Sequence, residues 1–125
     1  MTLPNSQTEL TIRTIAMPSD TNPAGDIFGG WVMSQMDLAA FLRSSEYSKG
    51  RTVTAAVKEM AFQKPVKVGD TVFIYTKLTR VGRTSMELFI EVWTGRAGNE
   101  QVKVTEASFV MVAVDEAGQP RPVSL

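Results

Sequence analysis

The sequence of 125 residues contains no histidine and no cysteine. A Ser-His-Asp triad, a Cys-His catalytic pair and a histidine-ligated zinc site are therefore excluded, and so are disulfide bonds. If the protein is an enzyme, its acid–base chemistry near neutral pH falls mainly to carboxylates. The absence of these two residue types thus leaves a short list of candidate catalytic residues.

Long apolar segments are missing too. The longest uninterrupted apolar run is far short of the ~20 residues that span a bilayer. The N-terminal residues are neither basic nor continuously apolar, unlike a secretory signal. We therefore expect a cytoplasmic protein without a membrane span. The 13 basic and 13 acidic residues give a net charge of zero, which argues against a general nucleic-acid binder.

The charge is unevenly distributed along the chain. Between Lys58 and Arg83 there are six basic residues and two acidic ones, a local excess of +4. Such an excess can hold a small polyanion such as a nucleotide phosphate. A solvated sheet face explains the same pattern, so the residues alone leave both interpretations open.

The hydrophobic pattern predicts one long helix and five strands. Residues 29–48 carry apolar side chains on nearly every side of a helix, which is typical of a buried helix. Alternating or Val-rich segments separated by turns predict strands at 8–17, 51–62, 71–80, 85–93 and 101–114. Short turns imply antiparallel pairing. We therefore predict a single α+β domain (1–125) in which an antiparallel five-stranded sheet curls around one central helix, with residues 1–7 and 117–125 frayed.

Asp37 is the only ionisable residue between Ile27 and Leu42, inside the predicted helix. A carboxylate in an apolar helix is energetically costly unless it is paired or solvated, and such groups mark functional sites more often than chance. Alternatively, Asp37 lies on a single solvated stripe of the helix beside Ser34. The pattern alone does not choose between a catalytic and a solvated carboxylate.

A turn with several special residues precedes the helix. Gly29 and Gly30 permit close approach of the backbone at the helix start, where free N–H groups and the helix dipole suit a carbonyl oxygen that gains negative charge. Packing of small residues against the sheet is the alternative. Asn22 is either a turn residue or an amide donor to the same oxygen. Asp26 is either a residue that caps or supports the helix start or a catalytic carboxylate.

Residues 18–37, PSDTNPAGDIFGGWVMSQMD, resemble the signature of the YciA-type acyl-CoA thioesterases in the hotdog superfamily. The similarity extends over nearly the whole chain. Further matching segments are VKEMAFQKPVKVGDTV (57–72), VGRTSMELFIEVW (81–93) and TEASFVMVAVDEAGQP (105–120). The resemblance implies the hotdog fold, a helix wrapped in a sheet, and hydrolysis of an acyl-CoA thioester to a free acid and CoA.

The resemblance also implies roles for individual residues. Asp37 lies where related enzymes carry a helix carboxylate that acts as the nucleophile or as the base that activates water. Gly29 lies where a backbone N–H polarises the thioester carbonyl, and Asn22 matches the side-chain amide that assists it. Asp26 belongs to the GDIFGG motif and is expected to orient water or the loop. No metal or cofactor is implied beyond the CoA that is part of the substrate.

According to the resemblance, the basic segment receives the phosphates of CoA. The expected contacts are Arg83, Thr84 and Ser85, in the turn of a hairpin, with Lys58 and Lys64 nearby.

Two other functions compete with a thioesterase. A non-catalytic acyl-CoA-binding or sensing protein would keep the hairpin and the glycine turn but would tolerate the loss of Asp37, so the presence of Asp37 favours an enzyme. A hotdog hydratase that uses carboxylates alone is a weaker alternative. The lack of histidine disfavours the hotdog dehydratases, which resemble this fold but depend on a catalytic histidine.

Helix geometry indicates that one chain cannot complete the site. Eight residues separate Gly29 from Asp37, which corresponds to roughly 12 Å along a helix. A nucleophile and an oxyanion donor must each come within about 3 Å of the same carbonyl group. We therefore expect an obligate homodimer that pairs Gly29 of one subunit with Asp37 of the other. The resemblance implies further assembly into a hexamer, as a trimer of dimers.

Overall fold

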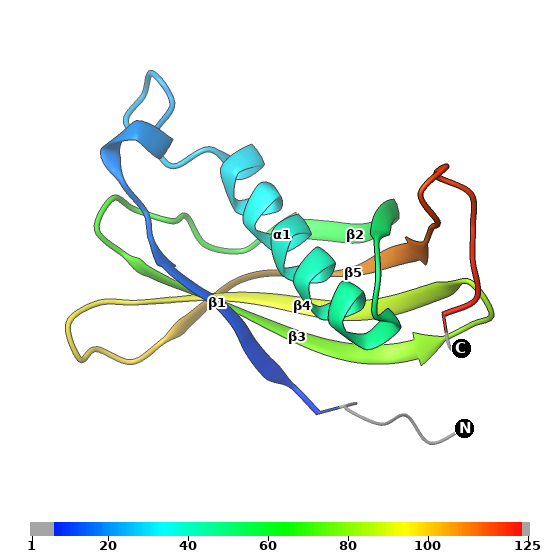
Figure 1. Cartoon of the computed structure of the whole chain (residues 1–125). Coiled ribbons are helices and arrows are strands. Elements are labelled where there is room, and N and C mark those ends of the chain that lie inside the picture. The colour runs from blue at the N-terminus through cyan, green and yellow to red at the C-terminus, as the bar shows by residue number, and fades with distance from the viewer. Residues whose placement is uncertain (1–6, 124–125) are drawn as a thin grey trace.

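The computed structural model describes residues 7–123, which form one long helix packed on a five-stranded sheet (Figure 1). The elements in chain order are β1 (Glu9–Ile15), the 3-10 turn η1 (Pro18–Asp20), α1 (Gly29–Ser48), β2 (Thr52–Phe62), β3 (Thr71–Val81), β4 (Ser85–Gly95) and β5 (Val102–Ala113). The predicted helix and all five predicted strands are confirmed, with ends that differ by no more than two residues. Residues 1–6 and 124–125, which were predicted to fray, lie outside the described residues.

The sheet has the strand order β1-β3-β4-β5-β2, and every neighbouring pair is antiparallel. β3, β4 and β5 follow one another as hairpins. β1 and β2 flank α1 in sequence and occupy the two edges of the sheet. α1 crosses one face of the sheet (Figure 1). The strand β2 therefore presents one unpaired backbone side over 11 residues, next to the helix.

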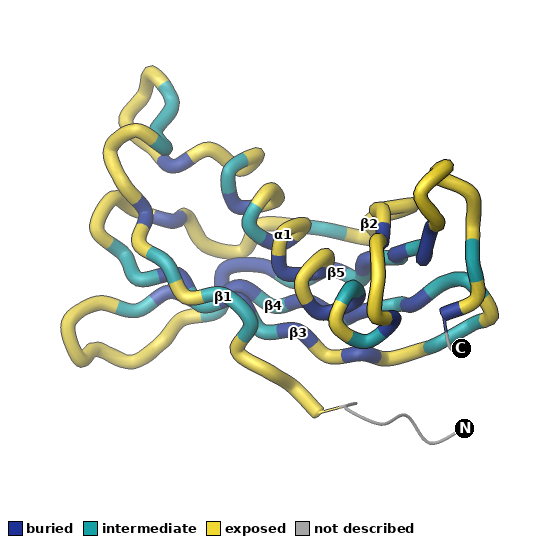
Figure 2. Tube along the Cα trace, viewed as in Figure 1, coloured by how far each residue is buried: buried dark blue, intermediate teal, exposed yellow. Residues whose placement is uncertain are grey.

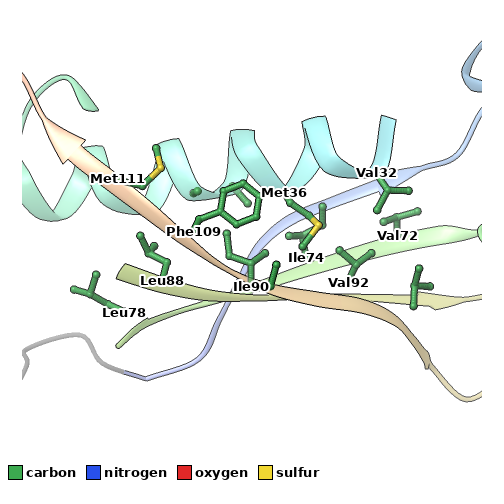
Figure 3. Close-up of a cluster of buried hydrophobic side chains, with 14 of the residues drawn as sticks. Val32, Met36, Val72, Ile74, Leu78, Leu88, Ile90, Val92, Phe109 and Met111 are labelled. Atoms are coloured by element: carbon green, nitrogen blue, oxygen red, sulfur yellow. The ribbon is translucent and has the colours of Figure 1, made fainter. Parts of the chain in front are cut away.

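The core lies between α1 and the face of the sheet that it covers (Figure 3). Val32, Met36, Ala39 and Ala40 recur every three or four residues and form the buried stripe of the helix. Because side chains alternate along a strand, every second residue of the central strands faces this stripe. These residues include Val72, Ile74, Leu78, Met86, Leu88, Ile90, Val92, Phe109 and Met111. Truncation of a fully buried residue such as Met36 to alanine is expected to cost about 2–5 kcal/mol.

The opposite side of α1 is not buried in the single chain, contrary to the prediction from its composition. Met33, Leu38, Phe41 and Leu42 are 40–52% exposed, and Figure 2 shows this exposed side facing away from the sheet. A helix on one face of an open sheet can bury only the side that meets the sheet. Exposed apolar surface that lies together is typical of interaction sites. No helix among the described residues is long and apolar enough to cross a membrane.

The polar end of α1 is more buried than its composition predicts. The guanidinium of Arg43 is paired with the Glu9 carboxylate at 3.0 Å and donates to the carbonyl and hydroxyl oxygens of Thr76 at 3.0 and 3.1 Å. The hydroxyl oxygens of Ser44 and Thr52 lie 2.8 Å apart in a hydrogen bond. A hydrogen bond to a charged group contributes about 1.5–3 kcal/mol. Arg43 thereby holds the helix against β1 and β3, and the polar residues orient it on the sheet.

The predicted fraying of residues 117–123 is wrong, because the chain turns back at Asp115 and stays attached to the sheet. The Asp115 carboxylate accepts two backbone hydrogen bonds within the turn, each 2.9 Å long. The backbone N–H groups of Arg121 and Val123 then donate to carbonyl groups of the folded body, both at 2.9 Å. Val123 is itself buried.

Candidate active site

Asp37 is placed by α1 so that its carboxylate meets the edge strand β2. Its Oδ1 atom accepts a hydrogen bond from the hydroxyl of Thr54. A carboxylate held by a fixed hydroxyl is restricted in rotation, which suits a nucleophile or base that must meet its substrate in one orientation. Sequence reasoning missed Thr54, because no local motif marks it and the pair forms only when β2 packs beside α1.

The surface around Asp37 is apolar rather than hydrophilic. Met33 and Phe41 lie one helical turn before and after it, on the same side of α1, and both are exposed in the single chain. Ser34, the expected polar neighbour, donates its hydroxyl to the Trp31 carbonyl at 2.7 Å instead of contacting Asp37. Asp37 and Ser34 are nevertheless both exposed in the single chain, so the solvated-stripe interpretation stays open. Asp37 is a carboxylate on an exposed apolar face, and a partner that covered this face would remove it from water.

The turn before α1 is organised by Asn22. The side-chain carbonyl oxygen of Asn22 accepts hydrogen bonds from the N–H groups of Ala24 and Asp26, at 3.0 and 3.1 Å. Gly25 closes the turn with a φ of 88°, which favours glycine. Asn22 is thus a turn residue, as one interpretation predicts. Its amide NH₂ group makes no hydrogen bond to residues 7–123, so it remains able to donate to a ligand.

α1 begins without a side-chain cap. Its N-cap is Phe28, which rules out the alternative in which Asp26 caps the helix. The Asp26 side chain is exposed and makes no hydrogen bond or ion pair within the described part of the chain. The backbone N–H groups of Gly29 and Gly30 likewise have no acceptor among residues 7–123, as expected for the first turn of a helix.

Gly29 opens onto a pocket of about 340 Å³. The other lining residues are Ile27, Val32, Phe62, Gln63, Lys64, Pro65 and Val66. A Cβ atom added to Gly29 would lie 3.5 Å from the Phe62 ring, an ordinary contact, and one added to Gly30 would meet nothing within 4 Å. The two glycines are therefore not needed for close packing. Because they have no side chains, the two glycines allow another molecule to approach the N–H groups at the positive end of the helix dipole.

Asp37 and Gly29 belong to two separate half-sites in a single chain. Eight residues of α1 separate them, about 12 Å along the helix axis. Asp37 bonds to Thr54 near the beginning of β2, whereas Gly29 lies beside Phe62 at the end of the same strand. One chain therefore does not bring both groups to one carbonyl carbon.

The predicted phosphate-binding hairpin lies at the Asp37 end of the sheet. Arg83 and Thr84 form the turn between β3 and β4, and Ser85 begins β4. Ser85 is paired with Val112 of β5, which is paired in turn with Val53 of β2, next to Thr54. The Arg83 side chain is exposed and makes no ion pair or hydrogen bond with the rest of residues 7–123.

The two predicted lysines do not join this hairpin. Lys64 lines the pocket beside Gly29, at the other end of β2. Lys58 lies beside Ser108 on the sheet face that points away from α1, and its ammonium group pairs with the Glu87 carboxylate at 2.8 Å. The structure thus brings Lys64 to one half-site and leaves Lys58 at neither. Among residues 7–123, no group of three or more acidic side chains is arranged to hold a metal ion.

Comparison with known proteins identifies the family and the fold of the chain. The sequence model of the thioesterase superfamily matches residues 24–99. Acyl-CoA thioester hydrolase YciA of Salmonella typhimurium is 49% identical over 121 residues, which cover 94% of this chain and 91% of that protein. The hexameric thioesterase y2039 from Yersinia pestis has a TM-score of 0.88 at 49% identity, covering 96% of this chain and 97% of that one. Cj0915, a hexameric hotdog fold thioesterase of Campylobacter jejuni, has a TM-score of 0.87 at 40% identity, covering 93% and 90%.

The TM-scores show that the five-stranded antiparallel sheet packed on one long helix is a fold shared with these thioesterases. The chain belongs to the thioesterase superfamily and has the hotdog fold. Its similarity over nearly the entire length to YciA confirms the predicted YciA-type membership within that superfamily.

Proposed function

We propose that this protein hydrolyses acyl-CoA thioesters to a free acid and CoA. The observation that carries the proposal is the placement of two groups of α1 beside opposite ends of the edge strand β2: an oriented carboxylate, that of Asp37, and a free N–H group, that of Gly29. The first group suits attack on a thioester carbonyl, and the second suits the oxygen of that carbonyl. The relative YciA, named an acyl-CoA thioester hydrolase, supports the substrate class.

A second copy of the chain completes each site in this proposal. An exposed edge strand is a template for pairing with another chain, and β2 offers 11 residues of such an edge. Two copies that pair β2 antiparallel about a twofold axis near Lys58 place Thr54 of one protomer opposite Phe62 of its partner. This register brings Asp37 of one protomer toward Gly29 of its partner. Twofold symmetry then produces two equivalent sites.

The same dimer covers the apolar surface that the single chain leaves exposed. Residues on the exposed side of α1 and along β2 would meet their counterparts there, namely Met33, Leu38, Phe41, Leu42, Val53 and Val57. Burial of apolar surface drives association by roughly 25 cal/mol per Å² before the costs of binding are subtracted. The two thioesterase structures compared above are hexameric. We therefore propose an obligate dimer, assembled into a hexamer as a trimer of dimers.

The chemistry follows from the two half-sites. The Asp37 carboxylate either attacks the thioester carbonyl carbon, forming an anhydride that water then hydrolyses, or removes a proton from a water molecule that attacks the same carbon. Both routes divide the elements of water between the acid and the CoA thiol. During attack, negative charge develops on the carbonyl oxygen. The Gly29 N–H group, the Asn22 amide and the dipole of α1 stabilise that charge.

The CoA phosphates require cationic groups away from the reacting carbon. We assign them to Arg83, Thr84 and Ser85, because this hairpin is exposed at the Asp37 end of the sheet and the Arg83 guanidinium has no partner within residues 7–123. Lys64 adds positive charge at the Gly29 half-site. Lys58 is the least suited of these residues to bind a phosphate, because it is already paired with a glutamate on the other face of the sheet.

Thiol release from a panel of acyl-CoAs tests the function. In Asp37→Asn we expect kcat to fall by about 10²- to 10⁴-fold, because the carboxylate is lost, while CoA binding is retained. Asp26→Asn tests the competing carboxylate, since it removes an exposed carboxylate on the same loop–helix segment. A larger loss of kcat in Asp26→Asn than in Asp37→Asn would assign the catalytic carboxylate to Asp26 instead of Asp37. Wild-type protein that binds CoA but releases no thiol would instead support the acyl-CoA-binding alternative.

A further inference from the structure

The last described residues form a strap across one end of the molecule. We define the C-terminal strap as residues 115–123, which follow β5 and run beside the end of α1 and the hairpin between β3 and β4 (Figure 1). The strap begins with the tight turn held by the Asp115 carboxylate. A backbone bridge between Val114 and Pro120 closes that turn.

Arg121 fastens the strap to the end of α1 and to the residues just before β2 and just after β5. Its guanidinium donates hydrogen bonds to the Val114 carbonyl at 3.0 Å, to the carbonyl and hydroxyl oxygens of Ser48 at 3.2 Å each, and to the Arg51 carbonyl at 3.3 Å. It also reaches the carbonyl of the neighbouring Pro122 at 3.3 Å. Ser48 is the last residue of α1, where carbonyl groups lack intrahelical donors and a cation is favoured. The planar guanidinium group of arginine has five N–H donors and is suited to this number of acceptors. The ammonium group of a lysine could not reach all of them at once.

The strap also holds the hairpin assigned above to the CoA phosphates. The backbone N–H of Val123 donates to the Arg83 carbonyl at 2.9 Å, and the Val123 side chain is buried in the core cluster. On the adjacent strand, the N–H of Ala113 donates to the Thr84 carbonyl at 2.9 Å. The backbone of the hairpin is thus held by the strap and by β5, while the Arg83 side chain projects without a partner among residues 7–123.

We propose that Arg121 is a positioning residue for CoA recognition: by fastening the strap, it fixes the hairpin that meets the CoA phosphates. This inference rests on the proposed function. Arg121 does not touch the reacting thioester in this arrangement, because its contacts lie at the end of α1, three helical turns beyond Asp37. Its loss should therefore weaken binding of the nucleotide part of the substrate and leave the chemical step intact.

Gly50 provides an independent way to displace the same side chain. Gly50 follows the end of α1, where the left-handed residue is Lys49, with a φ of 56°. Gly50 leaves room for the Arg121 side chain, since a Cβ atom at position 50 would lie 2.5 Å from Nη2 of Arg121. Gly50→Ala thus disturbs the Arg121 guanidinium without removing its charge.

The test compares two substrates with the same acyl group, an acyl-CoA and the acyl-pantetheine that lacks the nucleotide and its phosphates. For Arg121→Ala we expect KM for the acyl-CoA to rise about tenfold, the equivalent of one lost charged hydrogen bond. Neither kcat for the acyl-CoA nor kcat/KM for the acyl-pantetheine should change appreciably. Gly50→Ala should show the same selective rise. The double variant should be no worse than either single variant, because both act through one side chain.

Arg51→Ala is the matched control. It removes an exposed arginine close to the same helix end, whose side chain has no partner within the described residues. An equal rise in KM for Arg51→Ala would overturn the inference, because bulk charge would then explain the effect. Equal losses on both substrates in Arg121→Ala, or no effect of Gly50→Ala, would overturn it as well. Wild-type protein that hydrolyses neither substrate would overturn the proposed function and this inference with it, whereas the preceding outcomes overturn this inference alone.

Discussion

The hydroxyl of Thr54 donates a hydrogen bond to the carboxylate of Asp37 across 17 residues of sequence. This pair joins the middle of α1 to the edge strand β2, and it does so on the side of the molecule that has no partner in the single chain. If a second copy covered that side, Asp37 would lose most of its contact with water but would keep the hydroxyl that orients it. The pair is therefore the natural starting point for experiments on the site.

Removal of the Thr54 hydroxyl should slow catalysis without abolishing binding. A hydrogen bond to a charged group contributes about 1.5–3 kcal/mol, so Thr54→Val should lower kcat by about 10- to 100-fold. Thr54→Ser keeps the hydroxyl and should retain most of the activity. Steady-state thiol release, together with the dissociation constant of CoA, measures both effects. Equal activity of the valine and serine variants would remove Thr54 from the site.

The Gly29 N–H group can be deleted with little change of shape. Gly29 is the first residue of α1, a position where proline is tolerated, and the preceding Phe28 has φ −59° and ψ 134°, a conformation compatible with a following proline. Gly29→Pro should lower kcat by about 10²- to 10³-fold, the usual cost of one oxyanion donor. Gly29→Ala retains the N–H and should remain active, since its methyl would meet the Phe62 ring only at contact distance. A loss of activity in the alanine variant as large as in the proline variant would show that space, and not the N–H group, matters.

Local patterns were sufficient to predict the elements of this fold. The two-residue alternation along β3 and β4 and the apolar helix between Gly29 and Ser48 depend on neighbours in sequence, and both predictions are confirmed. The burial of the helix was overestimated, because composition shows that a side is apolar but not whether the same chain covers it. Leu38, which is 52% exposed, is the clearest example.

Contacts between distant segments were not predictable from these patterns. No local pattern gives Arg43 or Arg121 a structural role, yet each meets several backbone carbonyls that only the folded chain brings together. Within a single chain, Lys58 and Lys64 do not lie beside Arg83, for a related reason. Residues that are neighbours in sequence can lie far apart when the strands are long and antiparallel. In one chain, Lys64 and Arg83 lie at opposite ends of the sheet.

Dimerisation through β2 predicts a specific effect of charge on that strand. Val57 is exposed on β2 in the single chain, and two copies of Val57→Glu would bury like charges near the twofold axis. We expect this variant to be folded, monomeric and inactive. Val102→Glu makes the same change at a similarly exposed valine at the start of β5, three residues before Thr105, where the pairing with β2 begins, and should remain at least dimeric and active. Light scattering after size-exclusion chromatography gives the mass, and circular dichroism reports folding. An active monomer of Val57→Glu would contradict the shared site.

A shared site also predicts that two inactive variants restore each other. In a mixed dimer of Asp37→Asn and Gly29→Pro, one site combines both defects, and the other combines an intact Asp37 with an intact Gly29. Random mixing makes about half of the dimers mixed, each with one intact site, so about a quarter of the wild-type activity should return. Co-expression with two different affinity tags isolates the mixed dimers. If isolated mixed dimers release no thiol, Asp37 and Gly29 act within the same chain and the proposed register of β2 is wrong.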